Sequence, residues 1–378
     1  MSATVLAVGA WLKNAACLVL HGQAHWSPVH GDLSDPDACE ALEQSVQALL
    51  QQAQEAGAPV RAIAHDLHPD FFSTQLAIAT ADAMGVPAIG VQHHHAHLAA
   101  VVAEHGIEEP VVGLALDGVG LGSDGAPWGG ELLWLDGAQW ARVGHLWPLA
   151  LPGGDRAARE PWRMAASVLH ALGRGDEIVP CFGPEVGDAV ATGVHQILGK
   201  KLNCPLTSSA GRWFDAAAGA LGLCHHQLDE AQAAIALEQA AARALTWQPT
   251  LEALPGAVVT ADGVIDLRPV LAQLFDAAET DAAAAGFHLA MADALADALI
   301  AAAHARSIRT ATLGGGCFFN RILRERIEQR LTSARLTVCQ TGAKGCGDAG
   351  LALGQAWVAA QQLEPSQQPP VEETLSCA

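Results

Sequence analysis

The sequence has little positive charge. Among its 378 residues, 20 are lysine or arginine and 40 are aspartate or glutamate, which gives a formal net charge of −20 at pH 7. A surface so acidic repels a phosphate backbone and cannot gain affinity by releasing bound counterions. The charge balance therefore argues against nucleic acid as a partner, unless a basic subunit assists. Lysine occurs at only four positions, which are Lys13, Lys200, Lys201 and Lys344.

Other common signals are also missing. The nine cysteines are odd in number and show no C-x-x-C spacing, which argues against a disulfide scaffold or a structural zinc module. The N-terminal stretch 1–10 lacks the basic segment of a secretory signal, and we find no apolar run of transmembrane length. The absence of tyrosine and the abundance of alanine indicate compositional bias only. We therefore predict a soluble, cytoplasmic protein that does not bind a membrane.

Strand-like and helix-like stretches alternate through the first part of the chain. The strand-like stretches are short and apolar, and the helix-like stretches have helical periodicity or a capping residue. We predict strands at 4–8, 16–20, 60–65 and 88–91, and helices at 35–56, 71–84 and 96–104. This alternation predicts an α/β lobe over residues 1–110.

A second series of strands and helices begins at residue 111. We predict strands at 111–117, 131–135, 139–146, 310–313 and 335–338, and helices at 156–172, 282–303, 319–331 and 349–361, with a largely helical region through 245. Residues 111–361 are thus predicted to form a second α/β lobe with a helical insertion. Residues 362–378, rich in proline, glutamine, glutamate and serine, are predicted to be disordered. Two such series in succession are expected of a duplicated nucleotide-binding fold.

A cluster of histidines occupies residues 93–97, between an apolar run and a helical segment. His93 and His97 are four residues apart, so a helix places them side by side on one face. Two imidazoles at this spacing can share one divalent cation. A histidine-rich helix cap without a ligand explains the same residues, but acidic loops further along the chain favour the metal.

Three glycine-rich loops supply those acidic residues. In the first, Asp117 is followed by glycine at 118, 120 and 122, which lets backbone N–H groups approach an anion closely. A strand follows this loop, so it differs from a Rossmann fingerprint and instead has the form of the phosphate-binding hairpin of actin-like ATPases. An ordinary glycine-rich turn is the competing interpretation.

The other two glycine loops each precede a predicted helix. The run Gly314-Gly315-Gly316 leads from a strand into a helix, an arrangement that favours an anion or a nucleotide. The loop 345–350 contains Asp348, which either caps the following helix or projects its carboxylate at a metal. Asp215, after the hydroxyl-rich stretch 207–209, faces whatever that loop binds, whereas Glu230 fits a plain acidic first turn equally well.

These motifs match a known family in the same order along nearly the whole chain. The chain resembles the C-terminal, ATPase-like domain of HypF-type [NiFe]-hydrogenase maturation carbamoyltransferases. The shared motifs are Val8-Gly9-Ala10-x-x-Lys13-Asn14, His30-Gly31-Asp32-Leu33, His65-Asp66-Leu67-His68-Pro69-Asp70, Val91-Gln92-His93-His94-His95-Ala96-His97, Leu114-Ala115-Leu116-Asp117-Gly118, Trp128-Gly129-Gly130-Glu131, Leu151-Pro152-Gly153-Gly154-Asp155, Arg159-Glu160-Pro161-Trp162-Arg163-Met164, Thr207-Ser208-Ser209-x-Gly211-Arg212-x-Phe214-Asp215, the triple-glycine loop ending at Asn320, and Leu353-Gly354-Gln355.

The resemblance implies a fold and a reaction. The fold is a two-lobed actin/Hsp70-like (ASKHA) α/β fold with duplicated sheet and helix subdomains and a metal–nucleotide site between the lobes. In this family carbamoyl phosphate and ATP give carbamoyl adenylate. The carbamoyl group then passes to a C-terminal cysteine thiolate of the partner HypE, on the way to the cyanide ligands of [NiFe]-hydrogenase.

The resemblance also implies roles for individual residues. The expected ligands of a divalent iron, zinc, manganese or magnesium ion are His93, His97, Asp117 and Asp348. Lys13 resembles a phosphate contact, and with Asp117 it is the expected catalytic group. The expected nucleotide- and phosphate-binding residues are Gly118, Gly120, Gly211, Asp215, Glu230, Gly314, Gly315, Gly316 and Asn320.

Two departures from the family pattern affect these expectations. Full-length members carry an acylphosphatase domain, C-x-x-C zinc modules and a YrdC-like domain before this part, and none fits before Met1. We therefore expect either a natural stand-alone form or an excised domain, which receives carbamoyl adenylate from a separate protein or acts on carbamoyl phosphate directly, at least hydrolytically. In addition, the family's Asn-Asp-Gly-Gly loop reads Gly347-Asp348-Ala349-Gly350 here.

Three other functions remain open from the sequence. A tRNA threonylcarbamoyl transferase shares the fold and the paired histidines, but the acidic charge and the segments 151–155 and 159–164 count against it. A small-molecule O-carbamoyltransferase fits the motifs at 8–14 and 65–70 less well. A non-catalytic, nucleotide-binding maturation scaffold would not need the full set of metal ligands.

Overall fold

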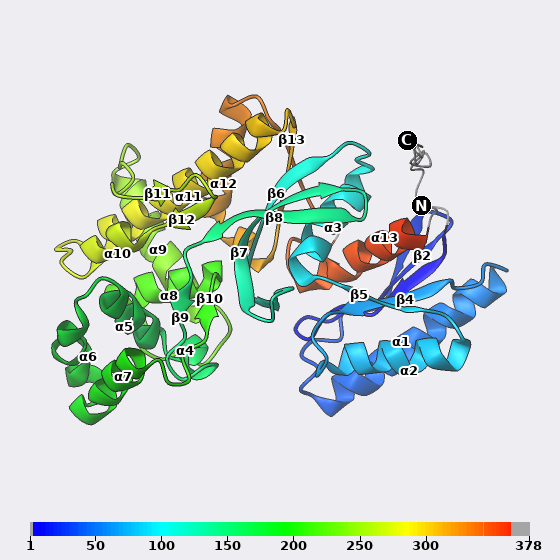
Figure 1. Cartoon of the computed structure of the whole chain (residues 1–378), viewed down its shortest axis with the longest axis horizontal. Helices are drawn as coiled ribbons and strands as arrows, with labels where there is room; N and C mark the ends of the chain where they lie inside the picture. Colours follow the sequence, from blue (N-terminus) through cyan, green and yellow to red (C-terminus); the bar gives the residue numbers. More distant parts are fainter. Residues whose placement is uncertain (1–2, 343, 364–378) are drawn as a thin grey trace, which may run out of the picture.

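The computed structural model describes residues 3–342 and 344–363, and shows two α/β lobes joined side by side (Figure 1). Of the predicted disordered tail, residues 364–378 lie outside the described residues. Residues 362 and 363 are the last two residues of the helix α13 (Leu351–Leu363).

The first lobe is built on a five-stranded sheet with the order β3-β2-β1-β4-β5. Strands β1, β2 and β3 are antiparallel neighbours, and β1, β4 and β5 are parallel neighbours. Parallel pairing needs crossover helices, which explains the alternation in the sequence. The strands are β1 (Val5–Ala7), β2 (Cys17–Leu20), β3 (Gln23–Trp26), β4 (Ala62–Asp66) and β5 (Ala88–Val91).

Two helices cover each face of this sheet. Alternate residues of a strand point to opposite faces, so Leu6 and Leu18 pack against α1 (Pro36–Glu55) and α2 (Phe72–Met84). Their neighbours in the same strands pack instead against α3 (His93–His105) and α13. Helix α13, from the end of the described chain, thus completes the core of the first lobe (Figure 1). The predicted lobe boundary at residue 110 stays a prediction.

The second lobe contains a seven-stranded sheet with the order β11-β12-β8-β7-β6-β13-β14. The long central strand β6 pairs antiparallel with β7 and parallel with β13. Helix α3 lies against this sheet too, so it sits between the two sheets of the molecule. The strands are β6 (Val111–Leu121), β7 (Pro127–Asp136), β8 (Gln139–Leu146), β11 (Val258–Val259), β12 (Val264–Asp266), β13 (Thr310–Gly314) and β14 (Thr337–Gln340).

Helices form the rest of the second lobe. The predicted helix 156–172 is interrupted, because Pro161 disfavours a helical conformation at the preceding residue, and Glu160 has φ −126° and ψ 79°. The remaining elements are the two-stranded sheet β9 (Leu149–Ala150) and β10 (Leu206–Thr207), the 3-10 helices η1 (Gly175–Glu177), η2 (Gly316–Phe319) and η3 (Asp348–Gly350), and the α-helices α4 (Arg156–Arg159), α5 (Pro161–Ala171), α6 (Ile178–Val186), α7 (Asp188–Lys200), α8 (Ala210–Ala220), α9 (Gln232–Trp247), α10 (Arg268–Leu274), α11 (Thr280–Ala305) and α12 (Arg321–Ser333).

One helix corrects an expectation from the sequence. By length and composition α11 is long and apolar enough to cross a membrane. The prediction that the chain has no apolar run of transmembrane length was therefore wrong. In the structure 78% of its most apolar 18-residue window is buried within the protein. Its apolar character is that of a core helix, packed against α9 and α12.

Candidate metal and nucleotide site

The histidine cluster forms the first turn of α3. The side chain of Gln92 accepts a hydrogen bond from the backbone N–H of His95 and so caps the helix where it follows β5. The helix is buried between the two sheets, and His93 and His97 are each about 3% exposed. The predicted helix began at 96, whereas the structure starts it at His93, which brings both imidazoles onto one helical face.

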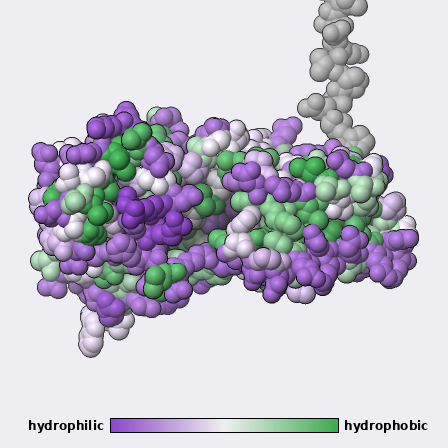
Figure 2. Space-filling view, turned by 90° about the horizontal axis from the view of Figure 1, so that it is seen from below, coloured by the Kyte–Doolittle hydropathy of each residue, from purple (hydrophilic) through white to green (hydrophobic). Residues whose placement is uncertain are grey.

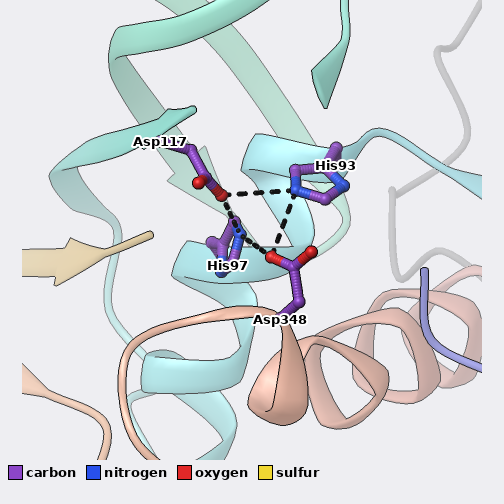
Figure 3. A group of neighbouring side chains, drawn as sticks. All are labelled: His93, His97, Asp117 and Asp348. Atoms are coloured by element: carbon purple, nitrogen blue, oxygen red, sulfur yellow. Dashed lines mark hydrogen bonds and ion pairs between the residues drawn. The ribbon is translucent and has the colours of Figure 1, made fainter. Parts of the chain in front are cut away.

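Four side chains from three elements converge beside this helix (Figure 3). His97 Nε2 lies 2.9 Å from Asp117 Oδ2 and 3.4 Å from Asp348 Oδ1. His93 Nε2 lies 3.5 Å and 3.7 Å from the same two oxygen atoms. One ligand atom of each residue lies within 4.8 Å of the others. Two imidazoles and two carboxylates at this spacing form a donor set suited to a divalent transition-metal ion.

His93 is oriented by a residue that sequence reasoning left without a role. Its Nδ1 donates to Asp66 Oδ2 over 2.7 Å, and Asp66 is completely buried at the end of β4. Because the carboxylate only accepts hydrogen bonds, Nδ1 carries a hydrogen, and Nε2 presents its lone pair whenever the ring is neutral. His93 Nε2 is buried and has no hydrogen-bond partner among the described residues. An orphaned ring nitrogen aimed at two carboxylates fits a metal ligand.

The charges of the cluster depend on one another. Burial opposes the charged form of His93, but the neighbouring carboxylates of Asp117 and Asp66 outweigh it and raise its pKa well above the usual value. Burial also opposes the charged form of His97, but its contacts with Asp117 and Asp348 outweigh burial and raise its pKa. The two imidazoles, against the effect of burial, hold the pKa of Asp117 well below its usual range. The carboxylates therefore require positive charge beside them, from protons or from a cation.

The two intervening histidines have a different environment. Burial lowers the pKa of His94 well below its usual value and that of His95 to about 3, so both rings are neutral. His94 Nδ1 accepts a hydrogen bond from Gln92 Nε2 over 3.0 Å. The rings of His94 and His95 pack near Trp128 and Trp140, respectively. These two residues therefore serve packing.

A cavity of about 310 Å³ opens beside the four ligands, between the two lobes. Its walls include six of the residues predicted from the sequence, namely Lys13, Asp117, Gly118, Glu230, Gly316 and Asp348. The space-filling view from below shows a surface hollowed between the two lobes, with hydrophilic and hydrophobic residues mixed around the hollow (Figure 2). Gly118 has no atom within 4 Å of the position a Cβ would take, so its backbone is accessible from the cavity.

Other predicted glycines allow close packing behind the cavity wall. A Cβ on Gly120 would lie 2.7 Å from the ring of His93, and one on Gly314 would lie 3.1 Å from the carbonyl oxygen of His97. Gly315 has φ +99°, and a Cβ there would lie 2.3 Å from Leu116 O. Gly211 packs in the same way against Gly118. These four glycines do not line the cavity.

Two further predicted residues, Asp215 and Asn320, also lie behind the wall. Asn320 Oδ1 caps α12 by accepting from Leu323 N, and its Nδ2 lies 2.9 Å from His288 Nε2, so its polar atoms are engaged within the protein. Asp215 is buried, and burial raises its pKa to about 6.

Lys13 and Glu230 form an ion pair at the edge of the cavity. Lys13 Nζ lies 3.0 Å from Glu230 Oε2, and both side chains are exposed. Lys13 belongs to the first lobe and Glu230 to the loop before α9, so the pair joins the two lobes. The lysine predicted to contact phosphate is therefore at the cavity, with a carboxylate as its partner.

Two protein-family models match consecutive parts of the sequence. Residues 1–104 match "HypF Kae1-like domain", and residues 113–355 match "Carbamoyltransferase, Kae1-like Domain, second subdomain". The chain belongs to the HypF family of carbamoyltransferases. The resemblance expected from the sequence motifs is thereby confirmed.

Individual HypF proteins agree with this assignment. The chain is 54% identical to the carbamoyltransferase HypF homolog of Cupriavidus necator, over 100% of this chain and 97% of that protein. It is 38% identical to carbamoyltransferase HypF of Rhizobium leguminosarum bv. viciae, over 99% of this chain and 47% of that protein. The chain thus spans nearly all of one HypF relative and about half of the other.

Solved HypF structures confirm the predicted two-lobed actin/Hsp70-like fold. A full-length HypF in its phosphate- and nucleotide-bound form superposes with a TM-score of 0.85 at 30% identity, over 97% of this chain and 56% of that one. HypF of T. kodakarensis gives the same TM-score at 28% identity, over 96% of this chain and 48% of that one.

Proposed function

We propose that this chain transfers a carbamoyl group during [NiFe]-hydrogenase maturation. The donor is carbamoyl adenylate, formed from carbamoyl phosphate and ATP. The acceptor is the C-terminal cysteine thiolate of a HypE-like partner in the cytoplasm, and the product leads to the cyanide ligands. The observation that carries the proposal is the convergence of His93, His97, Asp117 and Asp348 at the edge of a cavity lined by glycine loops.

The four side chains would hold a divalent metal ion. The unpartnered Nε2 of His93 and the nearby carboxylates supply suitable donors, and Asp66 fixes the orientation of the first ring. Such an ion, when bound, offsets negative charge on phosphate oxygens. Nothing in the donor set selects among iron, zinc, manganese and magnesium.

The chain's own residues would hold the adenylate. Gly118 and Gly316 line the cavity beside Asp117, where backbone without side chains allows a phosphate to come close. Helix α8 directs its N-terminus toward Gly118, since Ser209 Oγ donates to Gly118 O while capping the helix. Positioning of this kind brings the carbamoyl carbon to a fixed place at the cavity.

The partner supplies the nucleophile in this proposal. Its thiolate sulfur attacks the carbamoyl carbon and forms the S–C bond, while the C–O bond to the adenylate phosphate breaks and AMP leaves with the electron pair. Burial, with Asp117 nearby, raises the pKa of the Cys317 thiol well above its usual value, and burial raises that of Cys346 to about 11. Both thiols stay protonated, so neither is suited to attack.

The test is a transfer assay with the purified chain. The chain is mixed with a HypE-like protein ending in cysteine, carbamoyl phosphate and ATP, with and without a separate YrdC-like adenylating protein. The partner should gain one carbamoyl group by mass spectrometry. A transfer that needs the added protein shows that this chain uses the adenylate without making it. No transfer under either condition would contradict the proposal.

Alanine variants connect the assay to the site. His93→Ala and His97→Ala should each lose bound metal and transfer activity together, because each removes one imidazole donor. His105→Ala changes a histidine at the exposed end of the same helix and should behave as wild type. Full transfer by a variant that has lost its metal would show that the reaction does not require the metal.

A further inference from the structure

Two arginines to which the motifs above assign no role line the same cavity. Arg159 and Arg212 lie on its second-lobe wall, across from Lys13 on the first-lobe wall. The whole chain has only 20 lysines and arginines at a net charge of −20. Four acidic side chains line the same cavity: Asp117 and Asp348 belong to the metal-ligand cluster, and Glu230 pairs with Lys13, which leaves Asp229. Two arginines on one wall of so small a cavity are therefore notable in a chain this acidic.

An ion pair with the buried carboxylate of Asp215 positions the guanidinium of Arg212. Its Nε lies 2.9 Å from Asp215 Oδ2, without the alignment of a hydrogen bond. Gln227 Nε2 donates to the other oxygen of Asp215 over 3.3 Å. The terminal amino groups of Arg212 make no hydrogen bond with the described residues. The guanidinium is thus fixed at one edge, and its remaining donors are available to the cavity.

Arg159 differs from its neighbours in having no acidic partner. Arg156 and Arg163 both pair with Glu160, whereas Arg159 makes no ion pair within the described part of the chain. Its backbone is nevertheless fixed, because Gln227 N donates to Arg159 O over 3.0 Å.

Gln227 connects the two arginines. It bonds the backbone of α4 on one side and Asp215 of α8 on the other, and its Oε1 accepts from Ala233 N in α9 over 3.2 Å. A single side chain therefore ties α9 to the two helices from which Arg159 and Arg212 project. Partly buried hydrogen bonds of Gln227 thus hold the two helices, and the arginines project from them to the cavity.

We propose that Arg159 and Arg212 form a phosphoryl-binding pair on the second-lobe wall. A guanidinium offers several N–H donors in a planar fork that matches phosphate oxygens, and it keeps its charge at any working pH. The inference rests on the proposed function, since it assigns a substrate contact in that same site. The phosphoryl group belongs either to the nucleotide or to a separate phosphate such as that of carbamoyl phosphate.

The experiment measures binding of ATP, adenosine and inorganic phosphate by titration calorimetry. The variants are Arg159→Gln, Arg212→Gln and Arg212→Lys, with Arg156→Gln as the matched control. Arg156 lies in the same short helix, is 59% exposed and does not line the cavity. Melting temperatures of all variants check the fold. If Arg212→Gln does not fold, Arg159→Gln, which breaks no ion pair, and Arg212→Lys decide the question.

The expected result is about tenfold weaker binding of a phosphate-bearing ligand by Arg159→Gln and Arg212→Gln, because each loses charge-assisted hydrogen bonds. Adenosine binding and the Arg156→Gln control should match wild type. A loss confined to ATP places the pair on the nucleotide phosphates, and a loss confined to inorganic phosphate places it on the separate group.

Two results would overturn the inference. One is that the variants bind ATP and phosphate like wild type. The other is that their affinity for adenosine falls as much as their affinity for ATP. Either result would show that the arginines do not contact a phosphoryl group. The proposed function would survive that result, because it depends on transfer by the wild-type chain. Failure of the wild-type chain to bind either ligand or to transfer the carbamoyl group would instead remove both.

Discussion

Gln355 forms a pair of hydrogen bonds with the backbone of Gly9, which lies 346 positions earlier in the chain. Gly9 N donates to Gln355 Oε1 over 3.0 Å, and Gln355 Nε2 donates to Gly9 O over 3.2 Å. Both residues are buried. The pair fixes α13 on the sheet of the first lobe, next to the loop that carries Lys13.

Replacing Gln355 by alanine should destabilise the protein by about 2–4 kcal/mol. The change leaves a buried N–H and a buried carbonyl group without partners, and each costs free energy of unfolding. Chemical denaturation measures the effect. Gln362→Ala, at an exposed position of the same helix, is the control and should stay within about 0.5 kcal/mol of wild type. Equal stabilities of the two variants would show that the pair contributes nothing.

Gly354 should not tolerate a side chain. A Cβ at this position would lie 1.8 Å from the carbonyl oxygen of Ala96, so α13 and α3 could not keep their present separation. Gly354→Ala is expected to cost about 3 kcal/mol. It should also weaken metal binding, because Ala96 lies between the two histidine ligands on α3.

A second glycine gives the matched control for that variant. Gly199 lies in α7 with no atom within 4 Å of the place where a Cβ would be, so alanine there should stabilise the helix by about 0.5–1 kcal/mol. Denaturation and metal titration of both variants test the contrast. Normal stability and metal affinity in Gly354→Ala would contradict the close packing of the two helices.

The ligand cluster could be predicted because each part of it has a local signal. Two histidines four apart share a helical face, and carboxylates at the ends of strands and glycine loops point into a cleft. Asp66 has no comparable signal. It reaches His93 because β4 and β5 pair in parallel and place the end of β4 beside the start of α3, a contact that depends on strand order.

The glycines and α13 show a second limit of sequence reasoning. A glycine that exposes its N–H to a phosphate and one that lets a histidine ring pack against the backbone look the same in sequence, as Gly118 and Gly120 do here. The helical pattern of α13 was recognised, but periodicity does not state which sheet a helix covers. The predicted strands and helices nevertheless occur in the predicted order, because alternating apolar and capped stretches depend on local residues, but β3 and the short strands β9, β10, β11 and β12 were not predicted.

Asp66→Asn should weaken metal binding by about 10–100-fold. The amide no longer offers a negative charge to His93 Nδ1, so the ring loses both its fixed orientation and part of its basicity. Titrations with Zn²⁺, Mn²⁺ and Fe²⁺ against a competing chelator measure the affinity. Asp70→Asn changes an exposed carboxylate of the same motif and should bind metal like wild type. Unchanged affinity in Asp66→Asn would mean that the carboxylate does not support the ligand.

Asp215 should make stability depend on pH in an identifiable direction. Burial raises the pKa of its carboxyl from 3.8 to about 6, although Arg212 and Gln227 oppose the shift. Between these values the folded protein holds a proton that the unfolded chain has released, so stability falls as pH rises from about 4 to about 6. Above about pH 6 the ionised carboxylate costs the fold about 3 kcal/mol.

Asp215→Asn removes this titration and tests it directly. The free energy of unfolding of the variant minus that of wild type should increase by up to about 3 kcal/mol between about pH 4 and pH 6, and then level off. Any cost from leaving Arg212 without its acid is the same at every pH, because a guanidinium stays charged, so it shifts the whole curve without changing its slope. Denaturation curves at several pH values measure the difference. A difference that does not change with pH would show that the Asp215 carboxyl has the same pKa in the folded protein as in the unfolded chain, and that Arg212 and Gln227 compensate its burial fully.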